Sequence, residues 1–179
     1  MLLPLVMSAV MELAAPGGDV PPRWMDAAMH RALTAPERKV RAIGDRVTAA
    51  LREGARRSPT FADLLAALDR SDVIVYVEVS HDLRPNTDGR TMLVTRDAAY
   101  RYIRIHVRAL MSPDMTISLI GHELQHALEI ASTAWIRNDK DLRRFYERAG
   151  AGRSLPSAYE TQAARDAGYQ VRLELRRNA

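Results

Sequence analysis

The stretch from Ser112 to Ser132, "SPDMTISLIGHELQHALEIAS", predicts one long helix, and the interpretation of the remaining chain depends on it. The helix begins with a capping serine, a first-turn proline and an acid, Ser112-Pro113-Asp114, each of which stabilises a helix start. Apolar residues recur on one side of this helix, and we expect that side to face the core: Leu124, Ala127, Leu128 and Ala131.

Two histidines and a glutamate occupy another side of the same helix. His122 and His126 are four residues apart, so they project side by side at a spacing suited to two imidazole bonds to one Zn²⁺. Glu123 lies beside this pair, where its carboxylate can reach a water activated by the metal and accept its proton. The H-E-x-x-H pattern predicts metal-assisted hydrolysis, with Glu123 as general base. The alternative is a surface helix with solvated histidines.

The composition limits both the fold and the partners. A chain of 179 residues, of which 47% are hydrophobic and 27% charged, is suited to one globular domain with a real core. Cysteine is absent from the sequence, so a metal would be held by histidine, carboxylate or water. The net charge of +4 favours polyanions weakly, but the arginines are dispersed and aromatic residues make up only 6%. We therefore expect no nucleic-acid partner.

The N-terminal residues resemble a secretory signal. Leu2–Met11 is apolar, too short for the roughly 20 residues of a membrane span, and is followed by small residues. This pattern predicts export to the periplasm or outside the cell. However, no basic residue precedes the run and Glu12 lies near its end, so the alternative is an N-terminal helix of a cytoplasmic protein. Pro16–Pro22 predicts a flexible linker. We therefore divide the chain into a signal-like segment with linker, 1–22, and a single domain, 23–179.

Three runs in the middle of the chain alternate between apolar and polar residues. They are "VIVYVEV" at 73–79, "TMLVT" at 91–95 and "AYRYIRIHV" at 99–107. A period of two is typical of strands, and a turn-rich segment separates the first run from the second. These runs predict a small antiparallel sheet.

Helices are predicted on both sides of this sheet in the sequence. From Pro36, a helical stripe is formed by Val40, Ile43, Val47 and Leu51, and Ser58-Pro59 marks the start of a second short helix. Later helices are expected near Asp139–Arg148 and Ser157–Ala167, followed by a terminal strand "YQVRLEL" at 169–175. This order predicts an α+β fold, in which the small antiparallel sheet packs with the motif helix and additional helices.

The segment "HELQHALEI" resembles the active-site helix of the zincin metallopeptidases. The resemblance is sharp over Leu119–Leu128 and loose over Val73–Gly168. It implies a compact zincin-like core, in which a strand near the site aligns an extended peptide. After His126 the sequence continues Ala-Leu-Glu, which departs from the metzincin pattern, and no further histidine follows. The resemblance therefore implies a carboxylate as third zinc ligand, as in the gluzincin group.

Glu160, in "SAYETQAARDAG", is the preferred third ligand. Ala163 and Ala164 follow it by three and four residues, and such a small-residue face would let this helix approach the motif helix closely. Ser157 and Glu160 also match a capping box, in which the glutamate would only satisfy a backbone N–H at a helix start. The capping role is the alternative to the ligand role.

Other candidates are less favoured. Among the acids, the helix carries Glu129 past the metal, so we expect it to support a ligand or to line a groove. Glu147 lies among arginines, and Asp166 has a short side chain. Hydrogen bonds to a transition state could come from Tyr102, His106 and Tyr159.

These observations predict a zinc-dependent peptidase that acts on a peptide or protein substrate. One alternative is a catalytically silent binding or structural protein with the zincin fold. Another is a basic nucleic-acid-associated protein with a structural metal. The intact Glu123 favours the enzyme, because a structural metal site needs no general base.

Overall fold

The computed structural model describes residues 38–148, 153–155 and 158–178. The signal-like segment and linker predicted at 1–22, and the first part of the domain predicted at 23–179, lie outside the described residues. Within them the fold is α+β, with one mixed four-stranded sheet, a short two-stranded hairpin and five helices. None of the helices in these ranges combines the length and the hydrophobicity that a membrane span requires.

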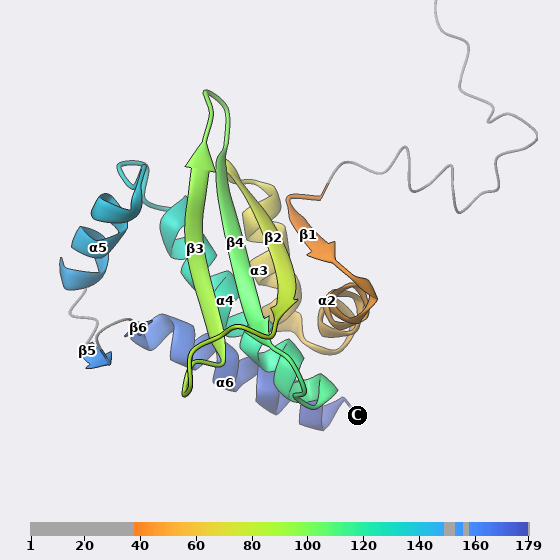
Figure 1. The fold of residues 1–179 in the computed structure, drawn as a ribbon. Helices are drawn as coiled ribbons and strands as arrows, with labels where there is room; N and C mark the ends of the chain where they lie inside the picture. Colours follow the sequence, from red (N-terminus) through yellow and green to blue (C-terminus); the bar gives the residue numbers. More distant parts are fainter. Residues whose placement is uncertain (1–37, 149–152, 156–157, 179) are drawn as a thin grey trace, which may run out of the picture. The chain divides into compact units, whose positions relative to one another are not determined.

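The four-stranded sheet has the order β1-β2-β4-β3 (Figure 1). Its strands are β1 (Val40–Ile43), β2 (Val73–Ser80), β3 (Gly89–Arg96) and β4 (Arg101–Arg108). Only β3 and β4 pair antiparallel, whereas β2 is parallel to both β1 and β4. Of the two pairings among the three predicted strands, the antiparallel direction is correct for β3 and β4 and wrong for β2 and β4, because alternation along a strand does not encode the direction of its partner.

The first predicted helix is shorter than expected. Val40 and Ile43 belong to β1, in which Val40 lies opposite Val75, and helix α2 (Asp45–Arg57) starts only afterwards. Gly44 separates the two elements with a φ of 87°, a left-handed conformation that glycine adopts without strain. In a strand, residues three apart point to opposite faces, and Val40 is buried whereas Ile43 is 44% exposed, so the two residues do not share the one face that the helical spacing predicted.

Three other helix starts were predicted correctly, whereas the last helix, expected from about Ser157, begins only at Gln162. Helix α3 (Pro59–Asp69) is capped by Ser58, whose side chain accepts a hydrogen bond from the Phe61 N–H at 3.1 Å. Helix α4 (Pro113–Ala131) follows Ser112, and helix α5 (Asp139–Arg148) begins where expected. The short hairpin of β5 (Arg153–Leu155) and β6 (Ala158–Tyr159) follows α5.

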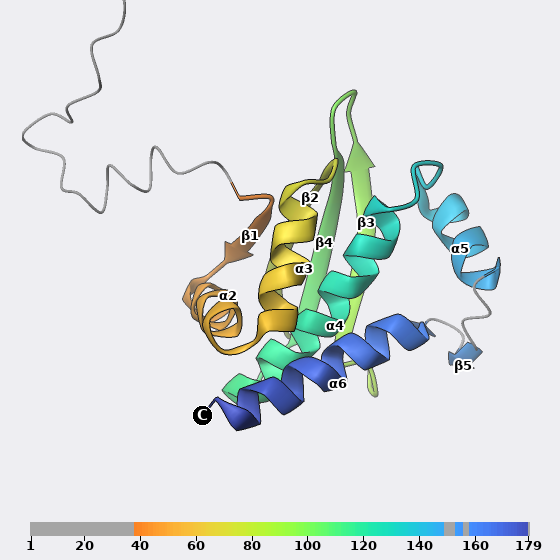
Figure 2. The same ribbon diagram turned by 180° about the vertical axis from the view of Figure 1, so that it is seen from behind.

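The last element is helix α6 (Gln162–Arg177), not a helix followed by a strand. The predicted terminal strand at 169–175 is therefore wrong. Its buried residues recur with the period of a helix rather than of a strand: Ala164, Gly168, Val171 and Leu175. Val171 and Leu175 share one face of the helix, and the half-buried Leu173 between them produced the alternation that imitated a strand. Figure 2 shows α6 lying across α4.

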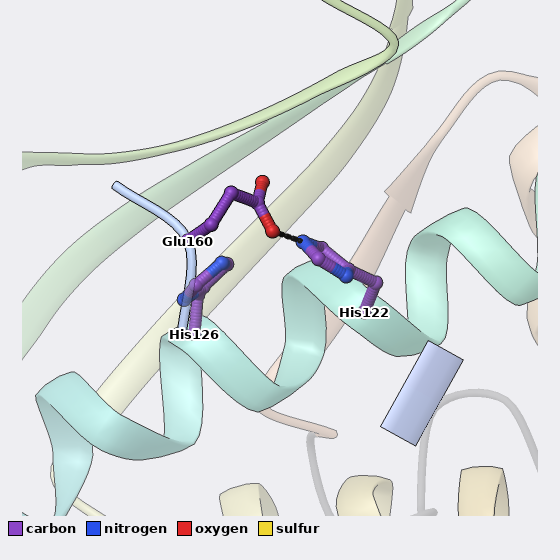
Figure 3. A group of neighbouring side chains, drawn as sticks. All are labelled: His122, His126 and Glu160. Carbon is purple, nitrogen blue, oxygen red and sulfur yellow. Dashed lines mark ion pairs between the residues drawn. The ribbon is translucent and has the colours of Figure 1, made fainter. Parts of the chain in front are cut away.

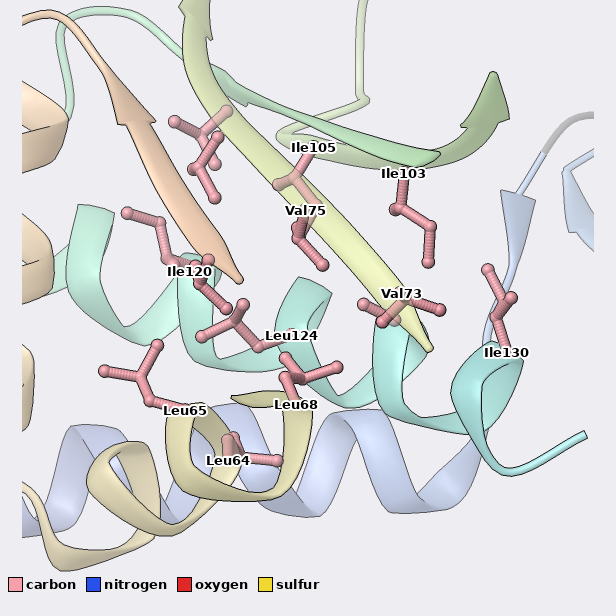
Figure 4. Packing of buried hydrophobic residues seen from close by; sticks show 14 of the residues in the cluster. Leu64, Leu65, Leu68, Val73, Val75, Ile103, Ile105, Ile120, Leu124 and Ile130 are labelled. Atoms are coloured by element: carbon pink, nitrogen blue, oxygen red, sulfur yellow. The ribbon is translucent and has the colours of Figure 1, made fainter. Parts of the chain in front are cut away.

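The core lies between one face of the sheet and the helices (Figure 4). From the strands it contains Val73, Val75, Ile103 and Ile105, and from the helices Leu64, Leu65, Leu68, Ile120, Leu124 and Ile130. Figures 1 and 2 show α3 and α4 on the same face of the sheet. Because one side of α4 packs into this core, the side that carries His122 meets the N-terminal half of α6.

Candidate metal centre

The structure brings together the three residues that the sequence proposes as ligands. His122 and His126 project from α4, and Glu160 comes from the backbone immediately before α6 (Figure 3). One potential ligand atom from each lies within 4.8 Å of the other two, and His122 Nε2 is 3.4 Å from Glu160 Oε2. Two imidazoles and a carboxylate are a donor set that could hold a metal ion.

Close contact between α4 and α6 makes this convergence achievable. A Cβ atom added at Gly168 would lie 3.0 Å from the His122 Cβ, and one added at Gly121 would lie 2.9 Å from Val171 Cγ2. Gly121 costs about 1 kcal/mol relative to alanine in a helix interior, and the approach of Val171 explains its presence. The small-residue face of α6 consists of Ala164 and Gly168, whereas Ala163 is exposed.

Glu160 does not act as the capping residue of the predicted capping box. Helix α6 begins at Gln162, and its N-cap is Thr161, whose hydroxyl accepts a hydrogen bond from the Ala164 N–H at 3.1 Å. Glu160 lies outside the helix, with its carboxylate beside His122. Ser157, the other half of the predicted box, is outside the described residues.

The charges of the group are complementary. A hydrogen bond with the His122 ring holds the pKa of Glu160 below its ordinary value, in spite of the burial of that carboxyl. Burial disfavours a charge on His122, but the carboxylates of Glu160 and Glu123 outweigh this effect and raise the pKa of the imidazole. In the metal-free protein, a positive charge on His122 therefore balances the negative charge of the neighbouring carboxylates, as a bound cation would.

Glu123 lies beside the donor group and against the sheet. Its side chain is only 4% exposed, and Thr91 Oγ1 donates a hydrogen bond to its Oε2 at 2.7 Å. A Cβ atom at Gly89 would lie 2.3 Å from its Oε1, so only glycine at this position of β3 leaves room for the carboxylate. Burial raises the pKa of Glu123 above that of an ordinary glutamate, although His126, His122 and Thr91 act against this effect. A raised pKa suits a group that accepts a proton during a reaction.

A hydrogen-bonded bridge connects His126 to Thr161 through Glu129, for which a supporting or groove role was expected. Glu129 Oε2 is 3.0 Å from His126 Nδ1, and Glu129 Oε1 accepts a hydrogen bond from Thr161 Oγ1 at 2.6 Å. Since Thr161 is the N-cap of α6 and directly follows Glu160, Glu129 connects one histidine to the segment that carries the third donor. Glu129 was expected to lie past the metal, and it contacts the far nitrogen of His126 rather than joining the donor group.

Tyr146 of α5 also contacts His126. Its hydroxyl is 3.3 Å from His126 Nδ1, and the two rings meet edge to face at 5.6 Å between centroids. The residue is 5% exposed, and burial raises the pKa of its hydroxyl. The sequence contained no signal for this contact, because the placement of α5 beside α4 depends on tertiary packing.

The remaining candidates lie elsewhere. Tyr102 donates a hydrogen bond to Asp97 at 2.7 Å, and His106 pairs with Glu78 at 2.8 Å. Both side chains alternate along β4 with its buried residues, so they project from the sheet face opposite the core. The side chain of Tyr159 lies outside the described residues.

The two other acids that were considered as the third ligand are not part of the donor group. Glu147 is exposed on α5, and Asp166 accepts a hydrogen bond from Gln162 at 2.7 Å. Neither belongs to the donor group found among the described residues.

No protein-family model matches this chain, and comparisons with curated proteins and with solved structures give no match either. The donor group and its surroundings are therefore the basis for inferring function.

Proposed function

We propose that this chain is a zinc-dependent peptidase, in which His122, His126 and Glu160 hold the metal and Glu123 is the general base. The observation that carries the proposal is the convergence of three donors within 4.8 Å, with a buried glutamate of raised pKa beside them. The identification of zinc rests on the donor chemistry, since histidine and carboxylate are its common ligands.

The number of donors favours catalysis over a purely structural metal. Structural zinc sites are usually closed by four protein ligands, whereas catalytic sites have three and leave one position open. The group found in the described residues offers three. When bound, zinc would supply Lewis-acid activation of a water and of the peptide carbonyl.

The protein side chains would then move the protons. Glu123 would accept a proton from the attacking water and pass it to the amine that leaves. The hydrogen bond from Thr91 keeps one carboxylate oxygen in place against β3, and the other oxygen lies against Gly89. The bridge from His126 through Glu129 to Thr161 would hold the imidazole in one orientation.

The position of β3 supports a peptide as substrate. This strand is at the edge of the described sheet, and two of its residues contact Glu123. An edge strand presents unpaired backbone N–H and C=O groups, to which an extended peptide can add as a further strand. A scissile bond aligned in this way would lie beside the donor group.

Two measurements on purified protein test the proposal. Elemental analysis should find about one zinc ion per chain, and a peptide library should be cleaved by the wild type but not by Glu123→Gln, which should retain its zinc. Glu147→Gln, an exposed glutamate on α5, is the matched control and should cleave normally. A chain that binds no metal after reconstitution, or a Glu123→Gln variant as active as the wild type, would contradict the proposal.

A second candidate is a metal-holding protein of the same fold without turnover. The hydrogen bond between Thr91 and Glu123 favours it, since this contact joins β3 to α4 and gives the glutamate a structural role. The two candidates differ in the library experiment. A protein that binds zinc but cleaves no peptide of the library would favour the second candidate.

A further inference from the structure

A groove of about 290 Å³ adjoins the donor group. His122 forms part of its wall, so the groove is continuous with the candidate metal centre. Its other lining residues come from α4 and the segment before it, from α6, and from the segment before β3: Met111, Met115, Ser118, Leu119, Arg165, Gly168, Tyr169, Arg172 and Asp88.

The direction of the groove follows from the helices. Gly168 lies against His122, whereas the Leu175 carbonyl accepts a hydrogen bond from Arg57, which is paired with Asp114 at the start of α4. Helices α4 and α6 therefore run antiparallel along this contact. From His122 the groove extends toward Met111, and Arg172 lies farther from the donor group than Arg165.

Two arginines give the groove a positive wall. Arg165 and Arg172 are exposed and lie seven residues apart, on one face of α6. Neither lies within ion-pair distance of a carboxylate in the described part of the chain. Arg165 donates a hydrogen bond to Gln162 at 3.1 Å, and its charge also acts on the Glu160 carboxylate. The acid on the opposite wall, Asp88, is already paired with Arg108 at 2.8 Å.

The rest of the wall is apolar or aromatic. Met111, Met115 and Leu119 line it from the side of α4, with Met115 37% exposed. Tyr169 stands between the two arginines in sequence and is 65% exposed. An apolar wall beside two guanidinium groups that form no ion pair among the described residues is complementary to a side chain with an aliphatic stem and a carboxylate end.

We propose that this groove binds a carboxylate of the peptide substrate, and that Arg165 and Arg172 determine this specificity. The proposal rests on the peptidase function, because it makes the groove the part of the substrate site next to His122. The carboxylate belongs either to an acidic side chain or to the C-terminus of the peptide. Both are recognised by the same guanidinium chemistry.

The test uses binding, so that it does not depend on turnover. The zinc-loaded Glu123→Gln protein is immobilised and exposed to a pool of peptides that differ by Glu, Gln or Lys at each position, with free or amidated C-termini. We expect about fivefold enrichment of the carboxylate-bearing member of each pair at low salt, and less at high salt, because the groove is exposed to solvent. Enrichment of Glu over Gln peptides would show that the groove binds a side-chain carboxylate. Enrichment of free over amidated C-termini would show that it binds the C-terminal carboxylate.

The variants assign the effect to the groove. Arg165→Gln combined with Arg172→Gln should abolish the enrichment, and Arg172→Glu should shift it toward Lys peptides. Arg177→Glu on the same helix, outside the groove, is the matched control and should leave the enrichment unchanged. Thermal melting checks that each variant is folded.

The outcomes separate the two proposals. Three outcomes overturn the groove proposal. The enrichment survives loss of both arginines, the carboxylate-bearing and neutral peptides of every pair are retained equally, or no peptide is retained. Enrichment that depends on the arginines, together with a wild type that cleaves none of the enriched peptides, supports the groove as a carboxylate site and contradicts the peptidase function alone.

Discussion

The two ends of helix α6 are attached to their neighbours by different chemistry. At the N-terminal end, Glu160 contacts His122 at 3.4 Å, and Thr161 donates to Glu129, which in turn contacts His126. All of these contacts are made to α4, by polar side chains of the candidate metal centre.

The C-terminal end is attached to α2 and α3 instead. Glu174 accepts hydrogen bonds from the Thr60 N–H at 3.1 Å and the Thr60 hydroxyl at 2.8 Å, and it also contacts the Ser58 hydroxyl. Arg57 donates to the Leu175 carbonyl and pairs with Asp114 at 2.8 Å. At this end the charges are satisfied by other protein groups. We infer that metal affinity depends on the first end and folding stability on the second.

The largest effect is expected from Glu160→Gln. Zinc held by two neutral imidazoles alone would keep its full charge, so loss of the carboxylate should weaken zinc binding by orders of magnitude. Competition against a chelator measures the affinity. Glu147→Gln is the control and should retain the metal under the same conditions. If Glu160→Gln holds zinc as tightly as the wild type, the N-terminal end does not supply the third ligand.

Glu129→Gln should have an intermediate effect on the same measurement. The amide cannot hold the His126 ring and the Thr161 hydroxyl as the carboxylate does, and loss of such a supporting group typically weakens metal affinity 10–100-fold. Thr161→Val, which removes the donor on the other side of Glu129, should weaken affinity in the same direction. An unchanged zinc affinity in both variants would show that the bridge only links the helices.

Glu174→Gln should have the opposite profile. This carboxylate accepts hydrogen bonds at the start of α3, so its loss should lower the free energy of unfolding by about 1–2 kcal/mol. Urea unfolding of the metal-free protein measures this change. Zinc affinity should stay within about twofold of the wild type. The control is Glu53→Gln, which removes the solvent-accessible ion pair with Arg56 and should lower stability less than Glu174→Gln does.

The smallest effect is the pH dependence of the C-terminal end. Burial disfavours a charge on Glu174, but hydrogen bonds from Ser58, Gln170 and Thr60 outweigh it and hold the pKa of this carboxyl below its ordinary value. A lowered pKa in the folded state stabilises the protein above the unfolded pKa, about 4.3, and this contribution is lost as the pH falls. The stability difference between wild type and Glu174→Gln should therefore shrink below about pH 4. A difference that stays constant down to pH 3 would contradict this account.

The sequence was informative where local signals determine the structure. The serine, proline and acid at 112–114 predicted the start of α4, and Ser58-Pro59 predicted the start of α3. The spacing of His122 and His126 on one helix placed them side by side. In these cases the residues that form the feature are neighbours in the chain.

The failures concern features that depend on tertiary packing. The parallel direction of β1 and β2 depends on the crossover through two helices, which the alternation of Val73–Ser80 does not reveal. The contact of Tyr146 with His126 joins separate helices and has no local pattern. Glu160 was selected for the two alanines that follow it. Ala164 is buried as expected, but Ala163 is exposed, and the contact of Gly168 with His122 was not predicted.

The edge strand β3 also affects how copies of this protein behave toward one another at high concentration. A strand with an unpaired edge is a template for strands of other molecules, and exposed edges of this kind promote aggregation. Two features counteract this tendency along β3. Its pairing with β4 is irregular between Leu93 and Thr95. In addition, Arg90 and Arg96 of one copy would repel the same arginines of a second copy that paired with this strand. The same strand can therefore remain available for a short peptide while disfavouring self-association.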